Sequence, residues 1–337
     1  PTPPDPHSFL RVARTALSRG GLGAGLIIAI LGGALALASL SLLYFAPELK
    51  LVKPICVALL FVLLGGGLGT WIQLERARGV HPDEAVDGVR AVLGILIVFA
   101  LCTPFFSLFD QKATTWVLQG KNMDSPSWDF DLGSAGVWQL ILRPAQMQAL
   151  NPALVMLMIP FNNLVLYPWL RRRGWEPTSL RKMTVGIVFA GLAWVAAGGI
   201  QLVMDGGGSD GKISILWQSL PYVLLTFGEV LVSATGLEFA YSQAPLAMKG
   251  VIMSFWNLTT TVGNLWVILV NAGVRNEAVT SNIERTGLSE TAFLMFFFAG
   301  FAFLAAFAFK LYTRRYKVRE VYRADPVKAA GDGGGAG

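Results

Sequence analysis

Residues 224–245 read LLTFGEVLVSATGLEFAYSQAP, an apolar run that carries two acidic residues, Glu229 and Glu238. A second apolar run, FFSLFDQKATTW at 105–116, carries Asp110. A carboxylate at bilayer depth costs roughly 3 kcal/mol on insertion scales, so it occurs mainly where it faces a partner or a water-filled path. Acidic residues on separate membrane helices therefore indicate an ion or solute pathway, and with it a transport function.

The composition also favours a membrane protein. The chain has 337 residues, of which 54% are hydrophobic and only 14% charged, whereas a soluble protein of this size needs more polar surface. The net charge of +6 comes from short basic clusters between apolar runs. Such clusters are typical of membrane flanks, so no nucleic-acid partner is expected. Cys56 and Cys102 lack metal-ligand spacing, and neither a metal nor a cofactor is expected.

Eight stretches have about the 20 apolar residues that cross a bilayer core as a helix. They are continuously apolar, without the alternation of a barrel wall, so helices are expected rather than strands. The predicted fold class is therefore an all-α membrane protein with eight transmembrane helices, at Gly21–Phe45, Pro54–Leu74, Val92–Leu118, Leu150–Leu170, Met183–Met204, Ile213–Tyr241, Val251–Ala272 and Thr291–Phe309.

The loop charges predict the orientation of these spans. An even number of spans places both termini on one side, where 19 of the 27 basic residues lie, against seven on the other side. The remaining basic residue, Lys112, lies inside a span. The positive-inside rule therefore predicts that both termini are cytoplasmic.

The connections carry weaker signals. Residues 121–148, with two tryptophans, are expected to form a plain connection, although a lid along the membrane interface is an alternative. His7 and His81 lie in polar connections and are expected to be solvated. Gly65 and Gly69 form a small-xxx-small pair, which favours close helix packing.

Helical periodicity groups some polar residues on one face. Positions four apart are neighbours on a helix, so Glu229 and Ser233 point the same way, with Thr226 one turn earlier. Glu238 follows Glu229 by nine residues, about 900° at 100° per residue, and is expected on roughly the opposite face. Periodicity leaves open which of the two glutamates lines a cavity.

Other readings of these residues remain open. The acidic residues can form buried ion pairs that only hold helices together, but the one basic residue at comparable depth, Lys112, lies two positions from Asp110 and points largely elsewhere. Trp256 can wall a cavity or simply pack between helices. Asn151 begins an apolar run that contains Pro160, where a broken helix near a polar cavity is plausible.

The stretch GEVLVSATGLEFAYSQAPLAMKGVIMSFWNLTTTVGN at 228–264 closely resembles the proton-coupled oligopeptide transporter family. FFSLFDQKATTWVLQ, QMQALNPALVMLMIPFNNLVLYPWL and TSLRKMTVGIVFAGLAWVAA resemble the same family in the same order. The resemblance implies the major facilitator fold, of which this chain has the second six-helix bundle. It also implies a partner, an N-terminal six-helix bundle.

The resemblance divides the chain into a cytoplasmic linker at 1–20, an additional helical pair at 21–88, the bundle at 89–314 and a cytoplasmic tail at 315–337. The additional pair is similar to one that prokaryotic members carry between their bundles. The implied location is a bacterial inner membrane, with the lipid bilayer, protons and di- or tripeptides as partners.

The resemblance also implies roles for individual residues. Asp110 matches a seventh-helix acid that pairs with a first-helix arginine and helps gate the outward side. Glu229 matches a tenth-helix glutamate that holds the amino terminus of the peptide. Asn151, Ser233 and Trp256 match pocket residues, and Phe106 stands where many members have a tryptophan.

Three alternatives to peptide symport are considered. Another solute within the same family is one, although a fixed carboxylate at Glu229 would repel an anion. A membrane-embedded aspartyl hydrolase is disfavoured because the Gly-x-Gly-Asp signature of such enzymes is missing, so no enzyme activity is expected. A non-transporting membrane protein is the third.

Overall fold

The computed structural model describes residues 6–45, 52–131, 137–207, 213–243, 248–274, 281, 283 and 285–316. The chain forms two compact units. The first comprises Pro1–Ala100, Leu237–Leu258 and Tyr316–Gly337, and the second comprises Leu101–Gly236 and Thr259–Arg315. These units do not test the domain boundaries expected from the sequence, which stay predictions.

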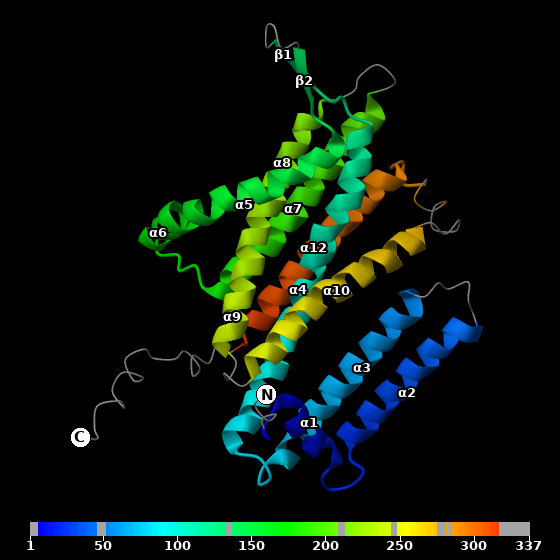
Figure 1. The fold of residues 1–337 in the computed structure, drawn as a ribbon, viewed down its shortest axis with the longest axis vertical. Coiled ribbons are helices and arrows are strands. Elements are labelled where there is room, and N and C mark those ends of the chain that lie inside the picture. The colour runs from blue at the N-terminus through cyan, green and yellow to red at the C-terminus, as the bar shows by residue number, and fades with distance from the viewer. Residues whose placement is uncertain are drawn as a thin grey trace. The chain divides into compact units, whose positions relative to one another are not determined.

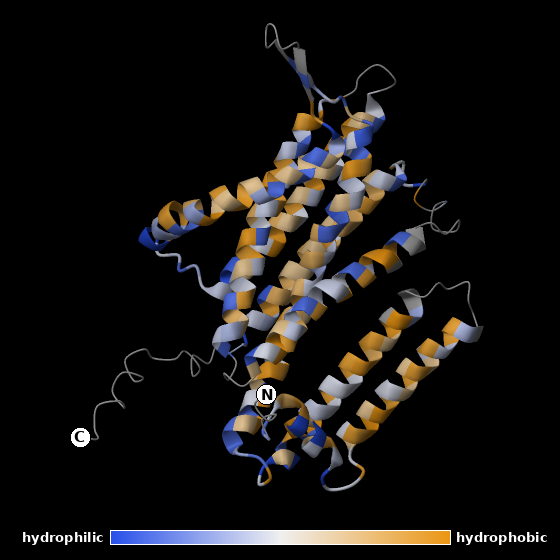
Figure 2. Cartoon of the chain, viewed as in Figure 1, coloured by the Kyte–Doolittle hydropathy of each residue, from blue (hydrophilic) through white to orange (hydrophobic). Residues whose placement is uncertain are grey.

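Eight spans are present within the described part of the chain, which confirms the predicted fold class. Each is a helix, or a series of helical segments, that is long and apolar enough to cross a membrane (Figures 1 and 2). They lie at Ala24–Tyr44, Val57–Ala77, Asp83–Lys121, Pro144–Arg172, Ser179–Gly206, Ile215–Gln243, Lys249–Ile268 and Glu290–Thr313.

The first two spans form a tight antiparallel hairpin of α2 (Ala24–Phe45) and α3 (Val52–Gln73), seen in blue in Figure 1. Glycines bring the two backbones together. A Cβ atom added to Gly65 would lie 2.8 Å from Cα of Gly32, and one added to Gly69 would meet the carbonyl oxygen of Gly25. The packing role predicted for Gly65 and Gly69 is therefore confirmed.

A short helix precedes this hairpin and was not predicted. α1 (Phe9–Ser18) lies within the stretch read as a linker, and it buries Phe9, Val12, Ala13 and Ala16 on one face. The Phe9 ring packs edge-on against Phe255 at 5.8 Å between centroids. Because this short helix is apolar on one face only, it lacks the continuous membrane-length run that predicts a span.

The expectation for His81 was wrong. This side chain is only 9% exposed, because it lies between α1 and the connection that follows the 3₁₀ helix η2 (Leu74–Ala77). Its Nδ1 shares a hydrogen bond with Nδ1 of His7 at 3.0 Å, and its Nε2 shares one with Oγ1 of Thr15 at 2.9 Å. Burial, and secondly the charge of His7, lower the pKa of His81 below its ordinary value.

In the second unit, α7 (Ser179–Gly206) packs along α8 (Ser219–Glu229) and along α12 (Glu290–Thr313). The 39-residue α4 (Asp83–Lys121) contributes Trp116 to the buried aromatic core of this unit. The Trp116 ring lies 5.5 Å from that of Trp194 and 5.0 Å from that of Tyr222. These rings fix the helices next to the site described below.

A chain of buried amides crosses the same unit. Gln119 on α4 donates to the carbonyl oxygen of Ala197 at 3.0 Å and to Oε1 of Gln201 at 3.1 Å. Gln218, which ends the 3₁₀ helix η6 (Ile215–Gln218), donates to Oε1 of Gln119 at 3.1 Å. Gln201 donates in turn to Asp205 at 2.8 Å. Polar contacts of this kind hold apolar helices together where the hydrophobic effect offers no driving force.

The connection at 121–148 contains a hairpin that the sequence did not predict. β1 (Ser127–Asp131) pairs antiparallel with β2 (Val137–Ile141), with Trp128 opposite Leu140. The preceding Asp124 exchanges two backbone hydrogen bonds, both 2.9 Å long, with Ile213 and Ile215. The hairpin is thus tied to the start of η6 and is more than a plain connection.

Two spans are interrupted by a wide π-turn. In the first, the 3₁₀ helix η4 (Pro144–Ala149) and α5 (Leu150–Phe161) lead to the π-turn η5 (Asn162–Leu166) and to α6 (Tyr167–Arg172). In the second, α8 is followed by the π-turn η7 (Val230–Ala234) and α9 (Thr235–Gln243). The irregularity expected around Pro160 is present, since that residue lies two positions before η5.

Candidate functional site

A polar cluster on α5 and α8 brings together three side chains that the sequence singled out. Nδ2 of Asn151 donates to Oε2 of Glu229 at 2.6 Å and to Oγ1 of Thr226 at 2.9 Å. An asparagine amide has two N–H donors, and both are used here. The amide therefore fixes one oxygen of the Glu229 carboxyl group, and the second oxygen has no hydrogen-bond partner among the described residues.

Local structure explains why Glu229 lies at this point. It is the last residue of α8, directly before η7, and π-turns occur frequently at functional sites. The preceding Gly228 lies against α7, because a Cβ on it would approach the carbonyl oxygen of Gly186 to 2.6 Å. The backbones of α7 and α8 therefore cross closely at Gly186 and Gly228, and this contact fixes α8 one residue before Glu229.

A buried cation lies near this cluster. Lys112 on α4 is only 6% exposed, and its Nζ lies 3.3 Å from the centroid of the Phe109 ring. Among the described residues it forms no ion pair within 4.0 Å. The carboxyl groups of Glu229 and Asp110 lie near enough to interact electrostatically with its charge. Glu229, Asp110 and Lys112 thus lie near one another, and the described part of the chain shows no salt bridge among them.

The remaining predicted residues have different surroundings. Ser233 lies half-buried inside η7, and Asp110 is half-buried on α4. Phe106 is buried and packs edge-on against Phe105, with centroids 5.5 Å apart. Trp256 belongs to the first unit, where it packs edge-on against Phe99 at 5.1 Å. The hydrogen-bonded cluster itself therefore contains Asn151 and Glu229 of the predicted set.

The π-turn changes the comparison between the two glutamates. Glu238 is exposed, whereas Glu229 is half-buried and hydrogen-bonded. Nine residues correspond to about 900° only at a constant 100° per residue, but η7 lies between the two glutamates and holds more residues per turn. The opposite-face assignment of Glu238 therefore does not follow from spacing, and its exposure is the better reason to set it apart.

Sequence reasoning missed one polar pair beside Asp110. Gln111 and Asn271 exchange amide hydrogen bonds of 3.3 and 3.2 Å, and Gln111 also donates to Oγ1 of Thr115 at 2.7 Å. The pair connects α4 with α10 (Lys249–Val274). A glutamine and an asparagine inside apolar spans were the available signal, because such side chains commonly bond across membrane helices.

Most of this part of the chain matches a known protein family. The family model PTR2, described as the POT family, matches residues 72–286 of this chain. The chain belongs to the POT family. The match includes both spans of the Asn151–Glu229 cluster and the α4 segment that carries Asp110 and Lys112.

Solved POT structures share the fold. An auto-inhibited POT family peptide transporter is 63% identical, with a TM-score of 0.87 over 96% of this chain and 60% of its own. The POT family transporter PepTSo is 57% identical, with a TM-score of 0.83 over 93% of this chain and 59% of its own. These neighbours confirm an all-helical membrane protein of the major facilitator type.

Curated relatives are animal solute carriers. Solute carrier family 15 member 3 of Mus musculus is 29% identical over 217 residues, which are 57% of this chain and 37% of the relative. Solute carrier family 15 member 2 of Mus musculus is 35% identical over 133 residues, 40% of this chain and 17% of the relative. The chain thus spans well under half the length of these relatives.

Proposed function

We propose that this chain is the C-terminal bundle, with the preceding helical pair, of a proton-driven symporter of di- and tripeptides. The observation that carries the proposal is the Asn151–Glu229 cluster with buried Lys112 nearby, in a chain that belongs to the POT family. A POT family peptide transporter that is 63% identical supports the substrate class. In this proposal an N-terminal six-helix bundle completes the transporter.

Glu229 receives the amino terminus of the peptide. An ammonium group that leaves water for a membrane cavity needs an anionic partner, and Asn151 holds the carboxyl group ready for it. Without peptide, Lys112 supplies the balancing positive charge from nearby, held against Phe109 rather than in a direct pair. Peptide binding and the position of Lys112 are therefore electrostatically linked.

Asp110 takes part in the proton step. It is half-buried on the same helix as Lys112, close enough to act on its charge. In the ionised state Asp110 attracts cationic groups of the opposite bundle, and in the neutral state it releases them. Protonation and peptide binding together thus bias the rocking of one bundle against the other. Ser233, Phe106 and Trp256 are proposed as pocket residues.

We place the protein in a bacterial inner membrane with both termini in the cytoplasm. The excess of basic residues on the side of the termini supports this orientation. The charge on Glu229 also separates peptides from anions as substrates, because a fixed negative charge repels an anion in a medium of low dielectric constant.

The test is uptake by the full transporter in proteoliposomes. A labelled dialanine should accumulate when the pH outside is lower than inside, and a proton carrier that collapses the gradient should stop accumulation. A labelled anion such as nitrate should not accumulate. Gradient-driven uptake of the anion without uptake of the peptide would reject the proposed substrate, and uptake of neither would reject transport of both classes.

A further inference from the structure

The connection between α1 and α2 is a glycine-rich turn, SRGGLGAG at residues 18–25. Gly20 and Gly21 have φ angles of 83° and 75°, a conformation that side chains other than glycine rarely adopt. The turn ends at the N-terminus of α2, where the first backbone N–H groups of a helix have no partner within it. Such an end attracts anions, although on its own it is not a binding site.

Two arginines beside this turn lack an acidic partner within the part of the chain that the structure describes. Arg19 donates to the carbonyl oxygens of Arg76 and Arg78, at 3.3 and 2.7 Å. Arg76 donates in return to the carbonyl oxygens of Arg19 and Gly21, at 3.2 and 3.3 Å. A guanidinium group has five N–H donors, so several donors of each arginine remain available.

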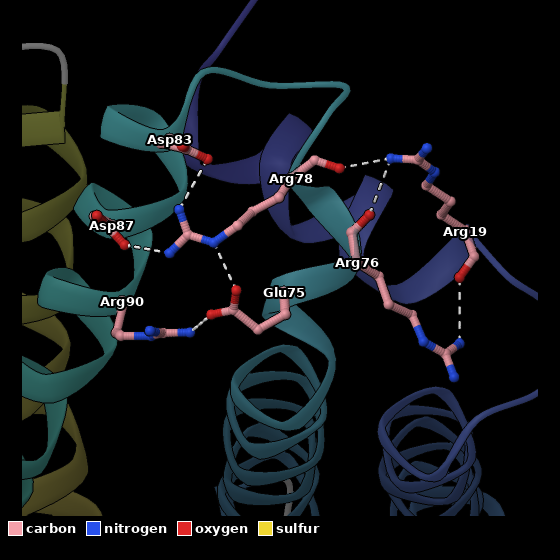
Figure 3. A network of polar contacts seen from close by, with 7 residues as sticks. All are labelled: Arg19, Glu75, Arg76, Arg78, Asp83, Asp87 and Arg90. Carbon is pink, nitrogen blue, oxygen red and sulfur yellow. Dashed lines mark hydrogen bonds and ion pairs between the residues drawn. The ribbon is translucent and has the colours of Figure 1, made fainter.

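Two neighbouring arginines, Arg78 and Arg90, do have acidic partners. Arg78 pairs with Glu75 at 2.5 Å, with Asp87 at 2.7 Å and with Asp83 at 2.9 Å, and Arg90 pairs with Glu75. Figure 3 shows these carboxyl groups gathered around Arg78 and Arg90, while Arg19 and Arg76 reach only main-chain oxygens. The two positive charges of Arg19 and Arg76 are therefore not balanced by the local acids.

A buried amide donor points to the same place. Gln73 is only 4% exposed, and its Oε1 accepts from the backbone N–H of Leu26 in the first turn of α2. Its Nε2 is buried and has no hydrogen-bond partner among the described residues. Burying a polar donor without an acceptor costs about 1–3 kcal/mol, so an unpaired amide of this kind calls for an acceptor.

These donors converge beside Gly23. A Cβ atom built on Gly23 would lie 2.5 Å from NH2 of Arg76, 2.6 Å from Nε2 of Gln73 and 2.8 Å from NH1 of Arg76. Three nitrogen donors thus lie against the side of Gly23 that a side chain would occupy, beside the first turn of α2. Only an acceptor-rich, negatively charged group satisfies such a set, and arginine matches the oxygens of phosphate.

We propose that Arg19, Arg76, Gln73 and the turn at Gly23 bind the phosphate of an anionic phospholipid headgroup. The phosphate sits where the first span begins, at the boundary of the apolar core. Exposed apolar side chains adjoin the donors and accommodate acyl chains: Leu22 is 79% exposed, and Trp71 and Ile72 are each 45% exposed. Basic pockets between membrane helices recognise lipid headgroups in this way.

The experiment is native mass spectrometry of the detergent-purified protein titrated with short-chain phosphatidylglycerol. The double variant Arg19→Gln, Arg76→Gln should weaken binding of the first lipid about tenfold, because two charge-assisted contacts are lost. The matched control Arg11→Gln, Arg14→Gln removes the same charge from exposed positions of α1 and should change binding less than about twofold. Zwitterionic phosphatidylcholine should bind weakly to all variants.

A third variant tests the geometry at constant charge. Gly23→Ala places a methyl group among the donors and displaces the flexible ends of Arg76 and Gln73, so it should weaken phosphatidylglycerol binding while thermal unfolding of the protein changes little. Equal losses of lipid affinity in the Arg19, Arg76 variant and in the Arg11, Arg14 variant would overturn the proposal. They would show that the lipid responds to the overall positive charge and not to a defined site. Unchanged binding in the Arg19, Arg76 variant would also overturn it, as would displacement of the lipid by millimolar inorganic phosphate, which would identify a free-ion site.

Discussion

At the scale of single residues, the carboxyl group of Glu229 is defined by its neighbours. It accepts a hydrogen bond from Asn151, it is half-buried, and the charge of Lys112 acts on it from nearby. Sequence reasoning selected Glu229 over Glu238 only through the family resemblance. The structure adds a physical reason, because among the described residues Glu229, and not Glu238, is held by a partner on a neighbouring helix.

We predict that Glu229→Gln sharply weakens binding of peptides with a free amino terminus. Truncating one side of a desolvated charge pair costs about 2–5 kcal/mol. Affinity measured by calorimetry on the full transporter should therefore fall strongly for dialanine, and little for the N-acetylated peptide, which binds poorly from the start. Glu238→Gln, on the exposed side of the same span, is the matched control and should leave both affinities unchanged. A proportionate loss for both peptides would contradict the assigned contact.

We predict that Asp110→Asn impairs proton-driven uptake more than peptide exchange without a gradient. An amide cannot cycle between an ionised and a neutral state, but it keeps the size of the side chain. The two assays are run on the same proteoliposomes, with counterflow of labelled dialanine as the exchange measurement. A similar loss in both assays would indicate that Asp110 has a structural role.

At the scale of elements, the spans were predictable and the short elements were not. Continuous apolar runs predict membrane helices because the bilayer requires every backbone polar group to be bonded within the segment. α1 is too short for that signal, and the β1–β2 hairpin lies in a polar connection. The π-turn η7 leaves no mark in the hydrophobic pattern, since LLTFGEVLVSATG is apolar on both sides of it.

The contacts of the candidate site could likewise not be predicted from apolar runs or from periodicity along one helix. Asn151 and Glu229 are 78 residues apart in sequence, so periodicity along one helix could not bring them together. Their proximity depends on the packing of α5 against α8, and the close crossing at Gly186 and Gly228 fixes α8 in turn. Lys112 was visible as a cation in a span, but its contact with the Phe109 ring was not.

We predict that Gly65→Ala destabilises the α2–α3 hairpin. The added methyl group would lie 2.8 Å from Cα of Gly32, and a backbone cannot yield as a flexible side chain does. Overpacking of this kind typically costs about 1–3 kcal/mol. Gly66→Ala is the control, because nothing lies within 4 Å of its added Cβ. Thermal unfolding in detergent should show a lower midpoint for Gly65→Ala alone, and equal midpoints would refute the close contact.

We predict that docking of α1 weakens as the pH falls through about 6.5, the ordinary pKa of histidine. Burial and the neighbouring His7 lower the pKa of His81 in the folded state. The undocked state therefore binds protons more readily, so stability is full above pH 6.5 and declines below it. The neighbouring carboxyl groups of Glu75 and Asp83 already pair with Arg78, so they offer a protonated His81 little compensation.

Hydrogen exchange of the α1 amides at pH 7.5 and 5.5, corrected for intrinsic rates, measures this change. Protection should drop at the lower pH in the native protein. In His81→Gln, which retains a hydrogen-bonding side chain without a titrating group, the drop should be much smaller. An identical pH dependence in both proteins would show that other groups control the docking.

At the scale of the whole molecule, the distribution of charge follows from the sequence alone. Nineteen basic residues lie on the side of the termini and seven on the other side. Because insertion of a membrane protein responds to this bias, eight spans and one asymmetry support the proposed orientation, with both termini in the cytoplasm. No interaction between helices is needed for that conclusion.

We predict that an impermeant thiol reagent applied to intact cells labels Ser127→Cys, in the β1 strand, but not Ser18→Cys, at the end of α1. Both positions should react once the membrane is permeabilised. The unsubstituted protein, which carries Cys56 and the buried Cys102, serves as the background control. Labelling of Ser18→Cys in intact cells would reverse the proposed orientation.

The wide turn at Val230–Ala234 has a consequence for changes in chain length. Deleting one residue from an ordinary α-helix turns every later side chain by about 100°. A π-turn already contains a surplus residue, so removing one there restores the regular hydrogen-bond ladder and leaves the segments on either side facing as before. Homologous chains one residue shorter within this turn can therefore keep the carboxyl group of Glu229 where it is, and an alignment should place its gap there rather than in the flanking helix.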